Sequence, residues 1–312
     1  MGQGENLWPP FTSEKDNCSV GAERGIMIMK KTEVTNLSRP YISVNNSFGG
    51  NQSWFENIEK THKGKTIKNY GCGLIGGSDI LLYLTKGAAG REFGMKKLSN
   101  EAVKSAGVSS SGVSSESYMD YILNMEKKYF HILPWFGISG ILLAWNMNMY
   151  FLLHGKEIIK LRGHNYHARW CVMPHNLLKK IKEMLSNDIP VVIAIGPGFF
   201  RKNKIIFYGK NEQKDGKIVF KPITKTKDHY VTITGVTEYK TTDKNLQDGF
   251  ETVNDKKSLS ETVTYDNIVM LEISSWGKKY YINFQEYLDY VKKNDNYYFS
   301  NILYIKPVGK HK

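Results

Sequence analysis

The chain has 312 residues, which is enough for one large domain or two small ones. Its hydrophobic content of 41% and aromatic content of 12% suffice for a folded core and exclude a wholly disordered chain. The chain has three cysteines, Cys18, Cys72 and Cys171. They are too few and too scattered for a disulfide framework, so one of them could act as a nucleophile.

The formal net charge is +13, and such an excess can attract nucleic acid or anionic lipid. The basic residues occur in short pairs, such as Lys179-Lys180, rather than in one run. No zinc-finger or RNA-recognition pattern accompanies them. We therefore interpret the charge as a lysine-rich surface and expect no nucleic-acid partner.

The first residues lack the basic start and the apolar stretch of a secretory signal, so we expect a cytoplasmic protein. Residues 1–40 show little periodic pattern and are expected to form a poorly ordered tail. A single domain is expected over residues 41–310, with a helical half at 41–188 and a sheet half at 189–310.

A helix is predicted to begin at Cys72, after a turn at residues 69–71. Cys72, Ile75, Asp79 and Leu82 recur at the spacing of one helix face. Three glycines lie in its first turns, each at a cost of about 1 kcal/mol relative to alanine: Gly73, Gly76 and Gly77. That cost indicates that another part of the chain packs very close to this helix.

Two further helices are indicated by their start signals. Residues 105–117 are rich in serine and glycine and predict a surface loop. Ser117 and Asp120 resemble a capping box and predict a helix to about Tyr129. Pro174 begins an amphipathic helix, with leucines and an isoleucine on one face and lysines on the other.

Between these helices, no charged residue occurs from Ile132 to Leu153. A membrane span needs about 20 apolar positions, but this stretch contains Pro134 and two asparagines, which are costly in hydrocarbon. We expect no membrane span, and instead a loop followed by a buried helix from about Ile138 to His154.

The second half of the chain is rich in strand patterns. Strands are predicted near residues 190–198, 203–208, 217–223, 229–239, 263–275, 279–283 and 297–306. Residues 240–261 are polar and poorly patterned and predict a loop. Helices followed by a strand-rich half indicate an α+β fold with a mostly antiparallel sheet.

Cys72 and His229 suit thiol catalysis. A cysteine at a helix start meets the positive end of the helix dipole, and a nearby imidazolium lowers the thiol pKa further. The backbone amide at that helix start, together with the side chain of Gln52, can bind an oxyanion. His229 opens an alternating strand and shares its side with Val231 and Ile233, while the threonines face away. We therefore expect the imidazole to project from this apolar face toward the helix of Cys72.

Four motifs occur in a fixed order along the chain. Gln52 comes first, followed by Gly-Cys-Gly around Cys72, Asp-His at His229, and Ser-Trp-Gly at residues 275–277. In this order they resemble the papain-like cysteine peptidase superfamily, near its bacterial double-glycine (bacteriocin-leader) peptidases, over about residues 45–305. The resemblance implies a papain-like fold in which the helical half carrying the cysteine packs on the sheet.

The resemblance also implies a peptide or protein substrate, with no cofactor and no metal. By position it implies these roles: nucleophile Cys72, general base His229, oxyanion donor Gln52 and histidine-orienting residue Ser274. We also expect Gly73 and Trp276 to contact the substrate.

Two features depart from the family pattern. The orienting residue is usually asparagine or aspartate, whereas Ser274 has a shorter reach and no charge to stabilise an imidazolium. Its neighbour Ser275 would take over if the strand register slipped by one residue, but it is expected to point to the opposite face of the strand. The separation of Gln52 from Cys72 is longer than usual, so residues 58–70 are expected to loop out.

Three functions fit the same pair of residues. The leading hypothesis is hydrolysis of a peptide or amide bond through a thioester at Cys72. The alternatives are a catalytically inactive domain that binds peptides, motivated by Ser274, and a thiol acyltransferase that passes the acyl group to an amine. A zinc site is not expected, because no standard ligand spacing occurs among the residues that invite one: His154, His164, His167, Cys171 and His175.

Overall fold

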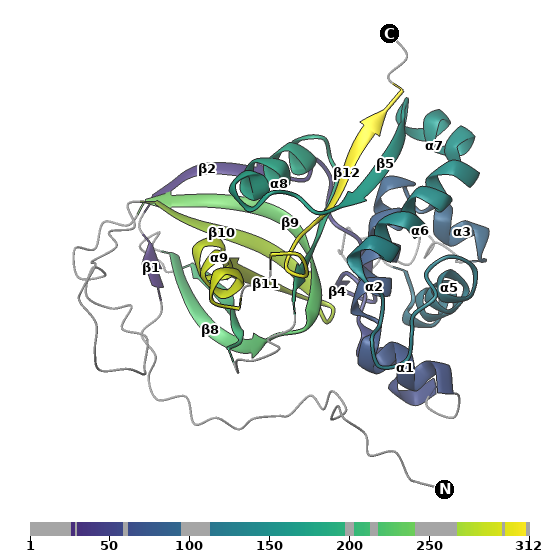
Figure 1. The fold of residues 1–312 in the computed structure, drawn as a ribbon, viewed down its shortest axis with the longest axis horizontal. Coiled ribbons are helices and arrows are strands. Elements are labelled where there is room, and N and C mark those ends of the chain that lie inside the picture. Colours follow the sequence, from purple (N-terminus) through teal and green to yellow (C-terminus); the bar gives the residue numbers. More distant parts are fainter. Residues whose placement is uncertain are drawn as a thin grey trace, which may run out of the picture.

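The computed structural model describes residues 26–28, 30–58, 62–94, 113–196, 203–212, 218–240, 267–294 and 297–309. Figure 1 shows most of the helices on one side of the molecule and a mostly antiparallel sheet on the other, with α8 (Leu177–Ser186) and α9 (Phe284–Lys293) lying against the sheet. The α+β class predicted from the sequence is therefore confirmed.

The helical half is built around α2, which runs from Cys72 to Leu84. Every residue of α2 after Cys72 is buried, and the helix contacts α1, α3, α5, α6, β6 and β9. The helices are η1 (Gln52–Ile58), α1 (His62–Tyr70), α2 (Cys72–Leu84), α3 (Ala88–Glu92), α5 (Ser115–Lys128), α6 (Gly140–Leu153), α7 (Gly155–Arg162), η2 (Pro174–Asn176), α8 (Leu177–Ser186) and α9 (Phe284–Lys293).

The starts of α5 and α6 are set by serine caps. Ser114 caps α5 by accepting a hydrogen bond from the backbone N–H of Ser117, so the helix begins before the predicted capping box. Ser139 caps α6 in the same way. The expectation that this uncharged helix is buried is only half right, because its outer side is exposed. None of the helices described by the structure is long and apolar enough to cross a membrane.

The main sheet of the described residues has eight strands in the order β1-β8-β7-β11-β10-β9-β2, with β6 also paired to β9. All of its pairings are antiparallel. Its strands are β1 (Ile26–Ile28), β2 (Lys30–Asn36), β6 (Val191–Ile195), β7 (Ile205–Glu212), β8 (Ile218–Thr226), β9 (His229–Lys240), β10 (Asn267–Ser275) and β11 (Lys278–Asn283). Two smaller antiparallel sheets of two strands each accompany it: β3 (Ser43–Val44) with β4 (Ser47–Phe48), and β5 (Asn165–Trp170) with β12 (Leu303–Val308).

The predicted tail at residues 1–40 is wrong in its last part. Residues 30–36 form β2, which pairs with the far end of β9, so this segment belongs to the sheet. Its sequence is polar because β2 lies at a sheet edge, where few side chains need to be apolar. Residues 1–25, most of the predicted loops at 105–117 and 240–261, and the start of the strand predicted at 263–275 lie outside the described residues.

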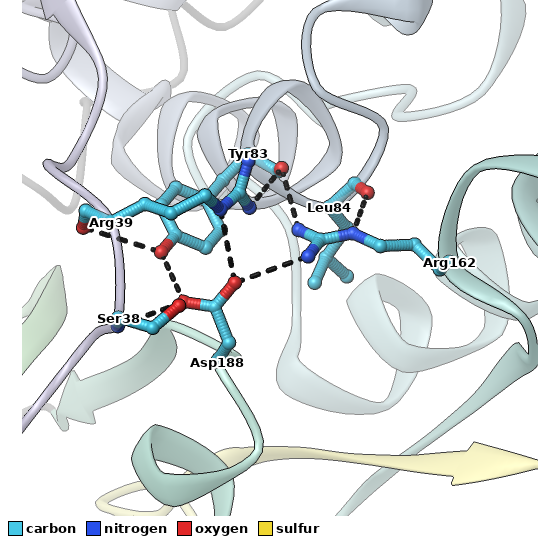
Figure 2. Close-up of polar contacts among 6 residues, drawn as sticks. All are labelled: Ser38, Arg39, Tyr83, Leu84, Arg162 and Asp188. Carbon is cyan, nitrogen blue, oxygen red and sulfur yellow. Dashed lines mark hydrogen bonds and ion pairs between the residues drawn. The ribbon is translucent and has the colours of Figure 1, made fainter.

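The C-terminal end of α2 is held by a group of residues joined by polar contacts, here called the Asp188 cluster (Figure 2). Its members are Ser38, Arg39, Tyr83, Leu84, Arg162 and Asp188. Arg39 and Arg162 lie 3.0 and 3.1 Å from the same carboxylate oxygen of Asp188. Both guanidinium groups also donate hydrogen bonds to the backbone carbonyl of Tyr83. Cations placed at the last carbonyls of a helix complement its dipole.

The Asp188 cluster connects the two halves of the molecule. Arg162 comes from α7, whereas Asp188 precedes β6 and Arg39 follows β2. Burial alone would raise the pKa of Asp188, but hydrogen bonds from Tyr83 and its neighbours, together with the charge of Arg39, lower it to about 2. The cluster is therefore ionised at neutral pH and anchors α2 against the sheet.

Candidate active site

One face of α2 forms a wall of a cleft between the two halves. Cys72, Ile75, Gly76 and Asp79 follow helical spacing and line this cleft. The opposite wall comes from the start of β9 and the end of β10: His229, Tyr230, Thr232, Ser274, Ser275 and Trp276. Gly50 and Gln52 complete the lining.

The glycines of α2 allow this close approach, as the sequence predicted. A β-carbon on Gly73 would lie 2.5 Å from a methyl of Ile138 and 3.2 Å from the ring of Tyr230. One on Gly76 would lie 3.0 Å from a methyl of Val192. The first contact is closer than real β-carbons tolerate, so glycine is required there for α2 to pack against its neighbours.

Cys72 is the first residue of α2, at the edge of the cleft. The residue is half-buried, while protein atoms surround its thiol. Burial raises the pKa of Cys72, and backbone N–H groups of Tyr230 and Gly73 oppose this only in part. The prediction of a lowered thiol pKa is therefore wrong. The loss of water around the thiol raises its pKa by more than the dipoles at the helix start lower it.

His229 is buried at the first position of β9. Its Nε2 lies 2.8 Å from the Oγ of Ser275, and its ring stacks on Trp276 with centroids 4.5 Å apart. Burial lowers the pKa of His229 to about 3, so the imidazole is neutral at neutral pH. With Nε2 engaged, Nδ1 is the ring nitrogen available for proton transfer.

The strand face predicted for the site is wrong. The glycine contacts place α2 over Tyr230 and Thr232, not over the face of Val231 and Ile233. His229 nevertheless lines the cleft, as the first residue of β9. Both faces of the strand are covered by protein, so an apolar pattern could not distinguish the side that meets α2.

The predicted contact between Ser274 and the histidine is also wrong. Ser274 donates a hydrogen bond of 2.6 Å to the backbone carbonyl of Phe48, and Ser275 contacts His229 instead. The pairing of β9 with β10 shifts by one residue between Glu272 and Ile273. Such a bulge exchanges the sides on which following residues lie, and sequence alternation cannot reveal it.

Gln52 lines the cleft from η1, the short helix that packs on α1. Its side-chain Nε2 donates a hydrogen bond of 2.9 Å to the backbone carbonyl of Lys68. An amide nitrogen carries two hydrogens, so this bond fixes the side chain and leaves a second donor. The expectation that residues 58–70 loop out is wrong for His62–Tyr70, which form α1, while 59–61 lie outside the described residues.

Asp79 is a cleft residue to which the sequence analysis gave no role. Its carboxyl group accepts hydrogen bonds from the Tyr118 hydroxyl at 2.5 Å, the Gly50 backbone N–H at 3.0 Å and the Tyr41 hydroxyl at 3.4 Å. Burial raises its pKa to about 7. Asp79 thereby connects α2 to the segment that leads into Gln52. An acidic residue two helical turns after Cys72 on an apolar helix was the signal for it.

Of the two residues predicted to contact the substrate, one lines the cleft and the other does not. Trp276 lines the cleft and covers the imidazole. Gly73 does not appear in the cleft lining and faces Ile138 instead. Asp228, beside the histidine, has a buried Oδ1 without a hydrogen-bond partner among the described residues, and burial raises its pKa.

The part of the chain that the structure describes holds no group of three or more histidine, cysteine, aspartate or glutamate side chains arranged to bind a metal. Comparison with protein-family models, with curated proteins and with solved structures gave no match.

Proposed function

We propose that the protein is a cysteine peptidase of the papain-like type, with Cys72 as nucleophile and His229 as general base. The proposal is supported chiefly by one observation: the thiol and the imidazole line the same cleft although they come from opposite halves of the chain. Gln52 lines it as well. The arrangement of a cysteine at a helix start, a histidine at a strand start and a tryptophan over the imidazole favours a papain-like fold.

In the first step, the thiol proton of Cys72 passes to Nδ1 of His229 while the sulfur attacks the carbonyl carbon of the substrate. The resulting oxyanion accepts hydrogen bonds from the backbone N–H at the start of α2 and from Gln52. The imidazolium then protonates the leaving amine, the C–N bond breaks, and a thioester remains on Cys72. Water hydrolyses the thioester with His229 again as base, which releases the acid and restores the thiol.

Ser275 and Trp276 have positioning roles in this scheme. For Nδ1 to accept a proton, Nε2 must carry the hydrogen and donate it to the Ser275 hydroxyl, which selects the required tautomer. Trp276 stacks on the ring and shields that hydrogen bond from water. Ser275 therefore takes the orienting place that the resemblance assigned to Ser274.

The directions of the two pKa shifts define the resting state. Because burial raises the pKa of Cys72 and lowers that of His229, the pair rests as a neutral thiol and a neutral imidazole. Proton transfer then accompanies attack on the substrate instead of preceding it. This differs from peptidases in which a thiolate–imidazolium pair exists before the substrate binds.

A mechanism-based label tests the proposal. The full chain is incubated with a peptidyl acyloxymethyl ketone, and the labelled cysteines are identified by mass spectrometry. We expect Cys72 to react much faster than the exposed Cys171, and His229→Ala to slow Cys72 labelling about 100-fold or more. The proposal is wrong if Cys72 and Cys171 are labelled at equal rates and if His229→Ala leaves the labelling of Cys72 unchanged.

Two neighbouring serines provide a matched pair within the same experiment. Ser275→Ala should slow the labelling of Cys72, because the imidazole loses its hydrogen-bond partner. Ser274→Ala should leave that rate within about threefold of the wild type, since its hydroxyl bonds the carbonyl of Phe48 instead. If Ser274→Ala has the larger effect, the assignment of the orienting residue is reversed.

A catalytically inactive peptide-binding domain is the second candidate. The neutral resting pair and a serine in place of a charged or amide orienting group favour it. In that case Cys72 labels no faster than Cys171, and the cleft still binds peptides, which isothermal titration with the Cys72→Ala variant measures.

A further inference from the structure

The outer side of α6 is apolar, which is unusual for a helix at the surface of a protein. Its inner residues Leu143, Met147 and Phe151 are buried, and Phe151 packs on Tyr166 of β5. A surface helix normally turns charged and polar residues to solvent. Here Trp145 is 65% exposed and Leu152 is 74% exposed.

The apolar surface extends beyond α6 itself. The turn that leads into the helix is closed by a bridge between Leu133 and Gly137, and Phe136 in that turn is 78% exposed. We call this surface the α6 face; it comprises Leu133, Trp135, Phe136, Ile141, Trp145, Met149, Leu152 and Leu153. An exposed apolar surface of this kind usually marks an interaction site.

The neighbouring structure makes the α6 face rigid. Ile138 lies beside α2 and its carbonyl accepts a hydrogen bond from Tyr230, so the turn is fixed to the protein core. Gly140 at the start of α6 packs against the ring of Trp170. Because these contacts hold the turn and the helix in place, their outer side chains stay available to a partner.

The charges around the α6 face have one predominant sign. Lys127 and Lys128 precede it, and Lys156 and Lys160 follow it on α7; all four are exposed. Lys128 is paired with Glu92. Between residues 127 and 160 the single carboxylate is that of Glu157. The chain as a whole carries +13, so the surroundings of this face attract negative charge.

We propose that the α6 face binds the surface of an anionic membrane, with α6 lying in the plane of the interface. Apolar and aromatic side chains on one side of a helix, bordered by lysines, are suited to the boundary between lipid head groups and acyl chains. A second copy of this chain would bring the same lysines against themselves, which opposes self-association through this face.

Vesicle flotation tests this proposal on the full chain. We expect the protein to float with vesicles containing phosphatidylglycerol and to bind vesicles of phosphatidylcholine alone at least about tenfold more weakly. Binding should fall as the salt concentration rises, and tryptophan fluorescence should shift to shorter wavelength on binding, since Trp135 and Trp145 leave water.

Variants of exposed residues localise the contact without disturbing the core. Phe136→Glu and Trp145→Glu should each reduce binding to the anionic vesicles at least about tenfold. Ile223→Glu is the matched control, because Ile223 is 60% exposed on β8, outside this face, and should bind as the wild type does. Lys156→Glu should weaken binding to anionic vesicles by a smaller factor.

Several outcomes would overturn the proposal. It fails if the wild-type chain floats with neither kind of vesicle, or if Phe136→Glu and Trp145→Glu float like Ile223→Glu. It also fails if light scattering finds a dimer that Trp145→Glu converts to a monomer, because a second copy then covers the face. The labelling of Cys72 is a separate measurement, so this test is independent of the proposed peptidase activity.

Discussion

The two ends of α2 are built in opposite ways. At the C-terminal end, Arg39 and Arg162 bind the last carbonyls of the helix and share the ionised carboxylate of Asp188 (Figure 2). At the N-terminal end, Gly71 has no side chain to cap the helix, and Cys72 and His229 in the adjacent cleft are neutral. Charge is concentrated where the helix is anchored and excluded where the chemistry is proposed.

This difference has a physical rationale. A helix start that is free of capping side chains leaves its backbone N–H groups available to a negative charge that forms during a reaction. The helix must then be held by contacts elsewhere, and the Asp188 cluster supplies them at the far end. We infer that changes at the two ends of α2 have separable effects: changes in the Asp188 cluster alter stability, and changes at Cys72 and His229 alter reactivity.

The largest expected effect on stability is at Asp79, and its dependence on pH has the opposite sign to that of Asp188. Because burial raises its pKa to about 7, the folded protein binds this proton more tightly than the unfolded chain does. Between about pH 4 and pH 7 its ionisation lowers the free energy of unfolding, by about 4 kcal/mol in total. Urea unfolding of wild type and Asp79→Asn across this range measures it. As the pH rises from about 4 to about 7, the free energy of unfolding of the wild type should fall relative to that of Asp79→Asn.

Asp188→Asn tests the anchored end of α2. Asparagine tolerates the positive φ of 58° at this position, so the change removes the charge and leaves the backbone. Removing one partner of a largely buried ion pair leaves two arginines uncompensated, and we expect the free energy of unfolding at neutral pH to fall by about 3 kcal/mol. The labelling rate of Cys72 should stay unchanged at temperatures where the variant is folded.

The pH dependence of that loss has a definite sign. The pKa of Asp188 is lowered to about 2, so its contribution is present above about pH 4 and disappears as the pH falls toward 2. The wild type and Asp188→Asn should therefore converge in acid. As a control, Glu183→Gln removes the partly exposed pair with Lys180 and should cost less than about 1 kcal/mol. A loss as large as that of Asp188→Asn would contradict the special role of the cluster.

Gly73→Ala gives the smallest expected change in stability but acts at the reactive end. The new methyl would lie 2.5 Å from Ile138, and the cost of overpacking, about 1–3 kcal/mol, exceeds the gain in helix propensity of about 1 kcal/mol. We expect a net loss of about 1 kcal/mol in urea unfolding, together with slower labelling of Cys72. Gly76→Ala is the matched change, because its nearest contact of 3.0 Å can adjust. If both variants behave alike, close packing at Gly73 does not position the thiol.

Much of the fold could be predicted from the sequence. The order of helices and strands followed from periodicity, and the cleft brings together Cys72, His229 and Gln52 as their motif order indicated. β2 was missed because an edge strand can be polar. α9 was missed as well, although Asn283 caps it and Glu286 three residues later completes the pattern of a capping box.

The details of the site depend on contacts that a linear pattern does not contain. Ser275 replaced Ser274 because of a one-residue shift between β9 and β10. The raised pKa of Cys72 results from burial by the opposite half of the molecule, which outweighs the local helix start. Periodicity describes which residues share a face, whereas these two properties depend on how faces from distant segments meet.

The pairing of β2 with β9 and the residues that line the cleft determine when, during synthesis, the proposed catalytic pair can form. Residues around 50 and 72 must meet residues around 230 and 275, and such distant contacts form late and slowly in folding. During synthesis Cys72 leaves the ribosome long before β9 and β10 exist. The nascent chain therefore carries an ordinary thiol, and the Cys72–His229 pair is assembled only once the last strands are in place.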